Sequence, residues 1–364
     1  MDGASGRAYV IAEAGVNHNG DVERALDLVR VAAEAGADAV KFQTFRAKDL
    51  VTATAAKAAY QAESTGAGSQ AEMLQALQLA PEHFERICAC CDEHAIEFLS
   101  TPFDAQSLDF LVRRLRMRAV KVSSGDLTNA PLLLQIAQTA QPVILSTGMS
   151  WLGEVEEALG VLAFGMMDAA VEATPSRKAF RQALTRPESR SLLREKVTLL
   201  QCTTQYPTPD GSVHLRAMDT LRQAFGLSVG FSDHSTGSAI AVAAVARGAE
   251  VLEKHFTLDR TLEGPDHAAS LEPGELVSMV EAIRRVEASL GRPEKRPDPV
   301  EMPNRSVARR VLVAARSLQA GDRFTPDTIA VKRAGEGVSP VHYWSYLGKT
   351  VARDYKAGDV LDTV

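Results

Sequence analysis

The chain has 364 residues and a formal net charge of -6, with 45% hydrophobic and 24% charged residues. Its length predicts two domains, because an eight-stranded α/β barrel takes about 250 residues. No long basic run is present, which argues against a nucleic-acid partner. The sequence shows neither a leader pattern at its start nor a run of roughly 18 apolar residues. We therefore expect a cytoplasmic protein that binds neither nucleic acid nor membrane.

Three of the four cysteines, Cys88, Cys90 and Cys91, crowd together. This is no disulfide framework, and a zinc site completed by a nearby histidine is the functional alternative. However, Phe84, Ile87, Cys88 and Cys91 follow the i, i+3, i+4, i+7 spacing of a helix that faces a core. We interpret these cysteines as small buried hydrophobic residues.

Short β-branched runs alternate with amphipathic helical segments, which is typical of a parallel sheet built from βα units. Asp21 is placed to cap the first helix and Gly36 to end it. Eight strands predict a closed (β/α)8 barrel. An open doubly wound sheet is the alternative, but the sequence after the first strand is not a Gly-rich dinucleotide fingerprint. The predicted strands are 9–12, 39–42, 96–100, 119–122, 143–146, 197–201, 227–231 and 251–255.

The pattern breaks near Gly291, where proline-spaced polar residues predict a stiff linker. We assign a catalytic barrel to 1–290, the linker to 291–306 and a small β-rich domain to 307–364. The fragments 319–322 and 356–359 repeat a similar Gly-Asp turn in this last part.

Polar residues occupy all eight predicted strand ends, where the catalytic groups of such barrels lie. Lys41 and Lys121 follow alternating apolar residues, so a period of two directs both into the barrel. Lysines beside hydroxyl groups and glycines suit a small anionic ligand with two or three charges. The alternative for a single lysine is a solvated surface residue. The strand-end residues are Glu13, Lys41, Gln43, Thr101, Lys121, Ser124, Ser146, Thr147, Thr203, Thr204, Tyr206, Ser232, Asp233, His234, Glu253 and His255.

His234 and His255 end consecutive strands and can therefore meet. Two imidazoles leave most positions of an octahedral ion open for water and substrate, which suits Mn²⁺ or Mg²⁺. Glu13 and Glu253 end the first and last strands, which become neighbours when a barrel closes. They are candidates for proton transfer, although one of them could merely balance Lys41 or Lys254.

Several motifs in order resemble the sialic acid synthase family, and the likeness runs nearly end to end. The C-terminal part resembles the antifreeze-like (SAF) domain of these enzymes, through VKR at 331–333 and GEGVSP at 335–340. The barrel motifs are IAEAGVNHNG at 11–20, VKFQ at 40–43, STPF at 100–103, KVSSG at 121–125, LSTGM at 145–149, FSDH at 231–234 and EKHF at 253–256.

The resemblance implies a TIM barrel with a SAF domain, and a domain-swapped homodimer in which each SAF domain covers the partner's barrel. It implies an enzyme that condenses phosphoenolpyruvate with an N-acetylated amino-sugar aldehyde and releases phosphate. Its metal ligands fall on His234 and His255, and Glu13 and Glu253 are candidates for proton handling. The implied phosphoenolpyruvate contacts are Lys41, Thr101, Lys121, Ser124, Ser146 and Ser232, and the sugar contacts are Gln43, Tyr206, Asp266 and Arg333.

One departure concerns Thr204, where sialic acid synthases usually carry Asn. With this variant, NHNG at 17–20 and TLDR at 257–260, the chain is more similar to synthases of N,N'-diacetyllegionaminic acid. The substrate of those synthases is a 2,4-diacetamido-trideoxy hexose in place of N-acetylmannosamine. Two alternatives remain open. One is another condensation of phosphoenolpyruvate with an aldehyde, such as a sugar-phosphate synthase of the deoxy-octulosonate type. The other is a non-catalytic sugar-binding protein.

Overall fold

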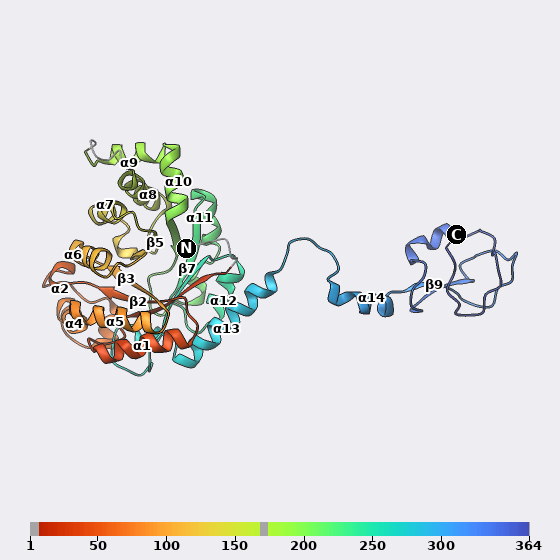
Figure 1. Cartoon of the computed structure of the whole chain (residues 1–364), viewed down its shortest axis with the longest axis horizontal. Helices are drawn as coiled ribbons and strands as arrows, with labels where there is room; N and C mark the ends of the chain where they lie inside the picture. The colour runs from red at the N-terminus through yellow and green to blue at the C-terminus, as the bar shows by residue number, and fades with distance from the viewer. Residues whose placement is uncertain (1–6, 168–173, 364) are drawn as a thin grey trace. The chain divides into compact units, whose positions relative to one another are not determined.

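The structure, a computed structural model, describes residues 7–167 and 174–363, so the predicted domain ends at 1–6 and 364 lie outside it. The chain forms two compact units, Met1–Gly291 and Arg292–Val364, and each is described by itself (Figure 1).

Eight parallel strands form the centre of the first unit. They follow the order β3-β2-β1-β8-β7-β6-β5-β4, and the two end strands β3 and β4 also pack together, so the sheet curls into a nearly closed barrel. The predicted (β/α)8 fold is thereby confirmed. The strands are β1 (Tyr9–Gly15), β2 (Ala39–Thr44), β3 (Glu97–Pro102), β4 (Val120–Val122), β5 (Val143–Ser146), β6 (Val197–Gln201), β7 (Ser228–Asp233) and β8 (Val251–His255).

Four strands run further than the sequence predicted, including β2, which ends at Thr44, and β3, which ends at Pro102. β1 continues through Glu13 to Gly15, and β7 continues past Phe231 to Asp233. The extensions are stabilised by pairing with neighbouring strands, with Glu13 opposite Lys41 and Asp233 opposite Lys254. Glu13 and Ser232 are therefore held in the sheet itself, which fixes their side chains more firmly than a loop would.

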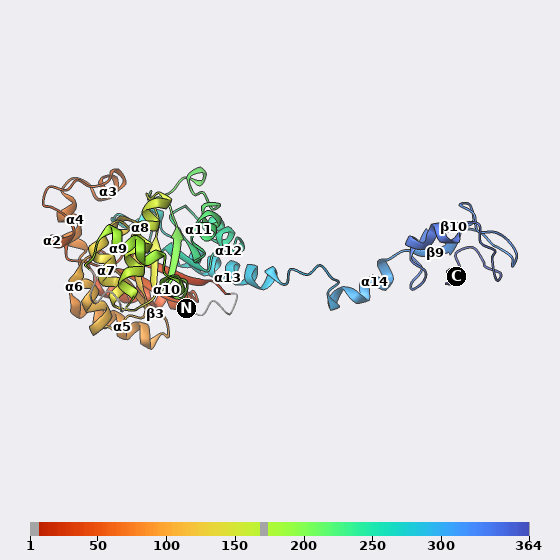
Figure 2. The same cartoon turned by 90° about the horizontal axis from the view of Figure 1, so that it is seen from above.

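Helices surround the strands (Figure 1), and α2, α3 and α4 lie together at one side of the barrel (Figure 2). Within the described residues, no helix has both the length and the apolar character that crossing a bilayer requires. The helices of this unit are α1 (Val22–Glu34), α2 (Ala47–Leu50), α3 (Ala59–Thr65), α4 (Gln70–Leu77), α5 (Pro81–Glu93), α6 (Ala105–Asp109), α7 (Ala130–Gln138), α8 (Leu152–Met166), α9 (Arg177–Leu184), α10 (Pro187–Lys196), α11 (Ala217–Phe225), α12 (Ala239–Ala246) and α13 (Pro273–Leu290). Short helical turns are η1 (Phe110–Arg114), η2 (Ser124–Asp126), η4 (Asp210–Ser212) and η5 (His267–Ala269).

Helix α1 begins and ends where the sequence predicted. The Asp21 side chain accepts hydrogen bonds from the backbone N–H groups of Glu23 and Arg24, which satisfies donors that a helix start otherwise leaves unpaired. Gly36 follows the helix with φ of 74°, a conformation that glycine adopts without steric strain.

Helix α5 packs with a face slightly different from the predicted one. Phe84, Ile87 and Cys91 are buried as expected, but Cys90 is also buried, whereas Cys88 is only partly so. The buried face is therefore centred slightly differently from the predicted one, because the contacts of α5 with α1 and β3 decide which residues are covered. All four cysteines of the chain are free thiols.

The second unit is built around β9 (Val311–Ala314) and β10 (Ile329–Lys332), which pair antiparallel. Its first residues form η6 (Pro299–Glu301) and α14 (Met302–Ala308), and η7 (Pro340–His342) and α15 (Tyr343–Tyr346) follow β10. The core of this unit consists of Leu312, Ala314, Leu318, Phe324, Ile329, Tyr346, Val351, Tyr355 and Leu361.

The two similar Gly-Asp fragments of this unit form the same turn. In each, the aspartate N–H donates to the carbonyl three residues earlier, and the aspartate carboxylate accepts from the N–H of that residue. Gly321 and Gly358 have φ of 99° and 94° at the third position, where glycine is favoured.

Candidate active site

The register of the strands places the candidate catalytic and binding residues of the barrel side by side at the carboxyl ends of the strands. Glu13 of β1 lies opposite Lys41 of β2 on one side and opposite His255 of β8 on the other. Glu253 of β8 lies opposite Ser232 of β7. We name the residues that meet here the strand-end cluster: Glu13, Lys41, Thr101, Lys121, Ser232, His234, Glu253 and His255. All eight are buried.

Two lysines and two glutamates form the charged centre of the cluster. The Nζ atom of Lys41 lies 2.6 Å from Oε2 of Glu13 and 3.5 Å from Oε2 of Glu253. Lys121 Nζ lies 3.5 Å from the other oxygen of Glu253. Because Glu253 contacts both ammonium groups, the two lysines necessarily face one space. The alternative that Glu13 balances Lys41 also holds, since the two form an ion pair.

Hydroxyl groups complete this centre. Lys41 Nζ donates a hydrogen bond of 3.2 Å to Oγ1 of Thr101. Ser232 Oγ donates one of 2.7 Å to Oε1 of Glu253. Two ammonium groups and two hydroxyls converging from four strands are donors suited to a small anion.

The two carboxyl groups have pKa values displaced in opposite directions. Burial raises the pKa of Glu13 to about 7, against the opposing influence of Lys41 and with help from Glu253. Burial also acts to raise the pKa of Glu253, but Lys121, Lys41 and the Ser232 hydroxyl outweigh it, so this pKa falls below its usual range. Such a pair offers one carboxyl that can exchange a proton near neutral pH and one that stays ionised.

The lysines also differ. Burial acts to lower the pKa of Lys41, but Glu13 and Glu253 overcome it and raise this pKa. Lys121 keeps a lowered pKa, because burial outweighs the attraction of Glu253.

His234 and His255 lie side by side, with ring centroids 5.6 Å apart. Nδ1 of His234 is 2.8 Å from the carbonyl oxygen of Thr203, so this nitrogen carries the proton and Nε2 presents its lone pair. Burial lowers the pKa of His234 to about 4 and that of His255 well below its usual value. Both rings are therefore neutral at pH 7, as metal ligation requires.

The donor set fits a divalent ion that retains open positions. Nδ1 of His255 is buried and has no hydrogen-bond partner among the described residues, and the Thr203 carbonyl orients the ring of His234 as an outer partner of a metal ligand does. Within residues 7–167 and 174–363, no three His, Cys, Asp or Glu side chains are grouped to hold an ion by themselves. Two imidazoles with oxygen ligands from water and substrate suit Mn²⁺ or Mg²⁺ better than a closed zinc site.

A second group of polar atoms lies at the ends of β4, β5 and β6. Ser124 Oγ accepts a hydrogen bond of 3.0 Å from the N–H of Gly148 and lies 3.2 Å from Sγ of Cys202. A Cβ atom added at Gly148 would lie 2.4 Å from Oγ1 of Thr204 and 2.8 Å from Oγ of Ser124. The Thr204 hydroxyl is buried without a hydrogen-bond partner in the described chain. Its position beside Gly148 places it at the site, whereas the sequence left its role open.

Tyr206, Gln43 and Ser146 are three further predicted site residues, and they differ in how they meet the strand-end cluster. The Tyr206 ring lies 4.1 Å from that of His234, centroid to centroid. Gln43 comes close to Glu13 and His255 above Gly15, where a Cβ atom would touch all three side chains. Ser146 is buried at the end of β5, but its hydroxyl makes no hydrogen bond to the strand-end cluster among the described residues.

Asp266 and Arg333 lie further along the chain. Asp266 is buried in the segment after β8, and burial raises its pKa to about 6 while the charge of Lys41 opposes the rise. Arg333 belongs to the second unit, where it follows β10 and is exposed.

Asp233 is a predicted strand-end residue that faces away from the cluster. Its Oδ2 accepts a hydrogen bond of 2.9 Å from Nζ of Lys254, and both side chains are fully buried. Successive strand residues point to opposite faces, so Asp233 and Lys254 lie behind His234 and His255. The alternating period could have shown this from the sequence.

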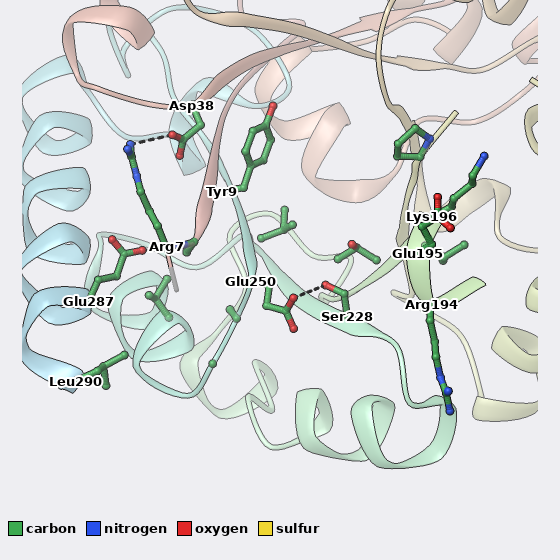
Figure 3. Close-up of a pocket in the computed structure, with 18 residues that line it drawn as sticks. Arg7, Tyr9, Asp38, Arg194, Glu195, Lys196, Ser228, Glu250, Glu287 and Leu290 are labelled. Carbon is green, nitrogen blue, oxygen red and sulfur yellow. Dashed lines mark hydrogen bonds and ion pairs between the residues drawn. The ribbon is translucent and has the colours of Figure 1, made fainter. Parts of the chain in front are cut away.

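A pocket of about 500 Å³ lies at the opposite end of the barrel, where β1, β6, β7 and β8 begin (Figure 3). Ser228 donates to Glu250 and Arg7 pairs with Asp38 within it. Catalytic groups of such barrels lie at the carboxyl ends of strands, so the strand-end cluster is the better candidate.

The fold and the cluster together define the class of protein: an α/β-barrel enzyme with two buried lysines and a histidine pair at the carboxyl ends of its strands. The NeuB family model matches residues 28–295 and the SAF domain model matches residues 309–363. The chain belongs to the NeuB family and carries a SAF domain.

Similar proteins are found over the full length of the chain. It is 41% identical to the N,N'-diacetyllegionaminic acid synthase of Campylobacter jejuni, covering 98% of this chain and 99% of that protein. It is 40% identical to the enzyme of the same name from Legionella pneumophila, covering 99% and 94%. Among solved structures, the N-acetylneuraminic acid synthetase of Leptospira borgpetersenii, in complex with citrate, is 30% identical with a TM-score of 0.64, covering 82% and 90%.

Proposed function

We propose that the chain is an N,N'-diacetyllegionaminic acid synthase, which condenses phosphoenolpyruvate with a 2,4-diacetamido-trideoxy hexose and releases phosphate. The observation that carries this proposal is that Glu253 joins Lys41 and Lys121 in the same buried cluster as the neighbouring His234 and His255. The two relatives at 40% and 41% identity support the choice of sugar, and so does Thr204, where sialic acid synthases usually carry Asn.

Lys41 and Lys121 hold the carboxylate and phosphate of phosphoenolpyruvate. The hydroxyls of Thr101, Ser124 and Ser232 add directed hydrogen bonds, and Ser146 lies near this group at the end of β5. Placing the donor between two fixed ammonium groups orients it before reaction, which removes part of the entropic barrier. Gln43, Tyr206 and Asp266 contact the sugar.

The reaction forms one carbon–carbon bond and breaks one carbon–oxygen bond. C3 of phosphoenolpyruvate attacks the aldehyde carbon, and the aldehyde oxygen takes up a proton to become a hydroxyl group. Water then adds at C2 and gives up its protons, and phosphate leaves with the C2–O electron pair to produce the 2-keto acid. Glu13, whose pKa burial raises to about 7, exchanges these protons, and Glu253 stays ionised between the two lysines.

A divalent ion completes this site, and Mn²⁺ or Mg²⁺ held by His234 and His255 would supply a Lewis acid for the aldehyde oxygen. The orphaned Nδ1 of His255 and the oriented ring of His234 support this assignment.

The working form is a domain-swapped homodimer in which the SAF domain covers the partner's barrel and Arg333 reaches the sugar. Exposed apolar side chains on both units support this proposal, with Met149 and Trp151 after β5 and Val341 and Trp344 in the SAF domain. The four free thiols suit a cytoplasmic enzyme.

The test incubates the protein with Mn²⁺, phosphoenolpyruvate and one of two sugars, N-acetylmannosamine or the diacetamido sugar. We expect faster phosphate release with the diacetamido sugar, and a product whose mass equals that sugar plus pyruvate. Faster consumption of a phosphorylated aldehyde would overturn the proposal in favour of a sugar-phosphate synthase. No phosphate release with either amino sugar would indicate a non-catalytic sugar-binding protein.

The metal assignment has its own measurement. His255→Ala should lose both turnover and the Mn²⁺ binding that electron paramagnetic resonance detects. His214→Ala is the matched control, because His214 is exposed, and it should keep both. Retention of wild-type Mn²⁺ affinity in His255→Ala would show that the ion binds elsewhere.

A further inference from the structure

The segment between β8 and α13, residues 256–272, carries Asp266 and contains only the short helical turn η5. Long segments with so little regular structure are usually mobile or functional. In this protein the segment is tied instead to the segment 16–21, which follows β1. The ties are side-chain hydrogen bonds between residues far apart in the sequence.

The first tie runs through His267, which is fully buried. Its Nδ1 lies 2.7 Å from Oγ1 of Thr257, and its Nε2 lies 3.1 Å from Oδ1 of Asn19. Nδ2 of Asn19 donates a hydrogen bond of 2.7 Å to the carbonyl of Glu263. His267 and Asn19 thus connect the beginning and the middle of the segment 256–272.

The directions of these hydrogen bonds are mutually consistent. Because the Asn19 amide group donates to Glu263, its oxygen must accept, and Nε2 of His267 must carry a proton. Burial lowers the pKa of His267 to about 4, so the ring is neutral and its Nδ1 accepts from the Thr257 hydroxyl. The Thr257 hydroxyl also accepts a hydrogen bond from the N–H of Asp259 and lies 3.2 Å from the carbonyl oxygen of that residue, so the network links several parts of the segment 256–272.

The second tie holds the backbone of Asp266 itself. Nδ2 of Asn17 donates to the carbonyl of Phe256 at 2.7 Å and to Oγ of Ser270 at 3.0 Å. Ser270 Oγ in turn donates a hydrogen bond of 2.6 Å to the Asp266 carbonyl. Asn17 and Ser270 are both buried, so water does not compete strongly for these bonds.

Close packing protects the first tie. A Cβ atom added at Gly264 would lie 2.6 Å from Cδ2 of His267 and 2.9 Å from Oδ1 of Asn19. The Gly264 backbone therefore covers the hydrogen bond between His267 and Asn19. Any side chain at this position would push the segment away.

Asp266, the residue that these ties hold, has a largely buried side chain. Asp266 is only 8% exposed, and its side chain makes no hydrogen bond or ion pair among the described residues, although it lies within the field of Lys41. Neither Asp266 oxygen is among the fully enclosed polar atoms that lack a partner, so the carboxyl group stays reachable by water or a ligand. The ties hold the backbone from which the Asp266 carboxyl group projects, before a ligand supplies hydroxyl or amide donors.

We infer that Asn17, Asn19 and His267 form a polar clamp that positions Asp266 to bind the amino sugar. The inference rests on the proposed function, because it takes the sugar as the ligand of Asp266. Asn17, Asn19 and His267 are positioning residues, since they act on the substrate through Asp266. The clamp should affect the sugar and leave phosphoenolpyruvate, which the lysines hold, unaffected.

The test measures steady-state kinetics of Asn19→Ala and His267→Ala in the full-length protein with Mn²⁺. We expect KM for the diacetamido sugar to rise about three- to tenfold per lost hydrogen bond, while kcat changes little and KM for phosphoenolpyruvate stays within about twofold. His267→Gln retains a side-chain N–H for Asn19 and should recover most of the wild-type KM. The matched control is Asn129→Ala, which removes the cap of α7 and should not change the sugar KM.

Hydrogen exchange gives a second readout, in case His267→Ala does not fold. In Asn19→Ala, amides of the segment 256–272 should exchange faster, and those of β2 and β4 should not. An unchanged sugar KM in an active Asn19→Ala enzyme, or an equal rise in KM for both substrates, would refute the clamp. A wild-type protein that releases no phosphate would instead refute the proposed function on which the clamp depends.

Discussion

The buried ion pair between Lys254 and Asp233 joins the two strands that carry His234 and His255, and its contribution to the stability of the barrel can be measured. Lys254 Nζ donates to Asp233 Oδ2 at 2.9 Å and also to the carbonyl of Ser235. The other Asp233 oxygen accepts from the N–H and hydroxyl of Ser235. Because Asp233 and Lys254 are opposite each other in β7 and β8, the pair joins these strands directly behind His234 and His255.

Lys254→Met removes the ammonium group but nearly preserves the volume of the side chain. Asp233 keeps its bonds to Ser235 and loses its only counter-ion within the described residues, so an uncompensated charge remains in a fully buried position. Breaking such a pair costs about 3–5 kcal/mol of unfolding free energy. The surface pair of Arg247 and Asp219, with side chains 40% and 38% exposed, is the control. Arg247→Met should cost less than about 1 kcal/mol.

The assay is urea unfolding at pH 7, followed by circular dichroism at 222 nm, to which the barrel helices contribute most. The double variant Lys254→Met with Asp233→Asn should be more stable than Lys254→Met alone, because no buried charge is left unpaired. A loss below about 1 kcal/mol in Lys254→Met, or a double variant that is no more stable than the single one, would refute the reasoning.

Three further predictions concern packing, pH and thiol reactivity. Gly230→Ala should destabilise the barrel by more than about 2 kcal/mol in urea unfolding, because the added Cβ would lie 2.2 Å from the Val251 carbonyl oxygen. Gly211→Ala is the control and should have little effect, since its Cβ would meet no atom within 4 Å. Equal losses of stability in the two variants would contradict the packing at Gly230. Burial lowers the pKa of His18 from 6.5 to about 4, so His18 takes up a proton in the unfolded chain before it does in the folded protein as pH falls. Between pH 6.5 and 4.5 this residue should therefore lower the unfolding free energy by about 2–3 kcal/mol. A His18→Gln variant whose unfolding free energy depends on pH as strongly as the wild type would show that the drop arises elsewhere. Burial raises the pKa of Cys88 to about 12 and that of Cys91 above its usual range. Both thiols should therefore react slowly with Ellman's reagent in the native protein and rapidly in urea. Fast labelling of Cys91 in the native protein would contradict its burial.

Much of the fold could be predicted because it depends on neighbouring residues. Alternation of apolar residues located the eight strands, and it directed Lys41 and Lys121 into the barrel. The contacts of both lysines with Glu253 agree with that direction. The same alternation was not applied to Asp233, which therefore was expected at the mouth and lies on the opposite face.

The sequence also left some choices to packing. Cys88 and Cys90 lie within the same helix, and a stripe of apolar residues cannot decide which of them is buried when both are small. The contacts of α5 with α1 and β3 decide it. The importance of His267 was likewise hidden, since its partner Asn19 is 248 positions away in the chain.

The sequence by itself determined the strands, the cap at Asp21, the turns at Gly321 and Gly358, and the residues that could carry the chemistry. Each of these follows from local periodicity or from backbone preferences of single residues. Only the tertiary structure decided which charges pair, how Glu253 joins the two lysines, and how Asn19 and His267 fix the position of Asp266. These contacts exist because the barrel brings β1 beside β8, and no local pattern encodes the distance between atoms on strands that far apart in the chain.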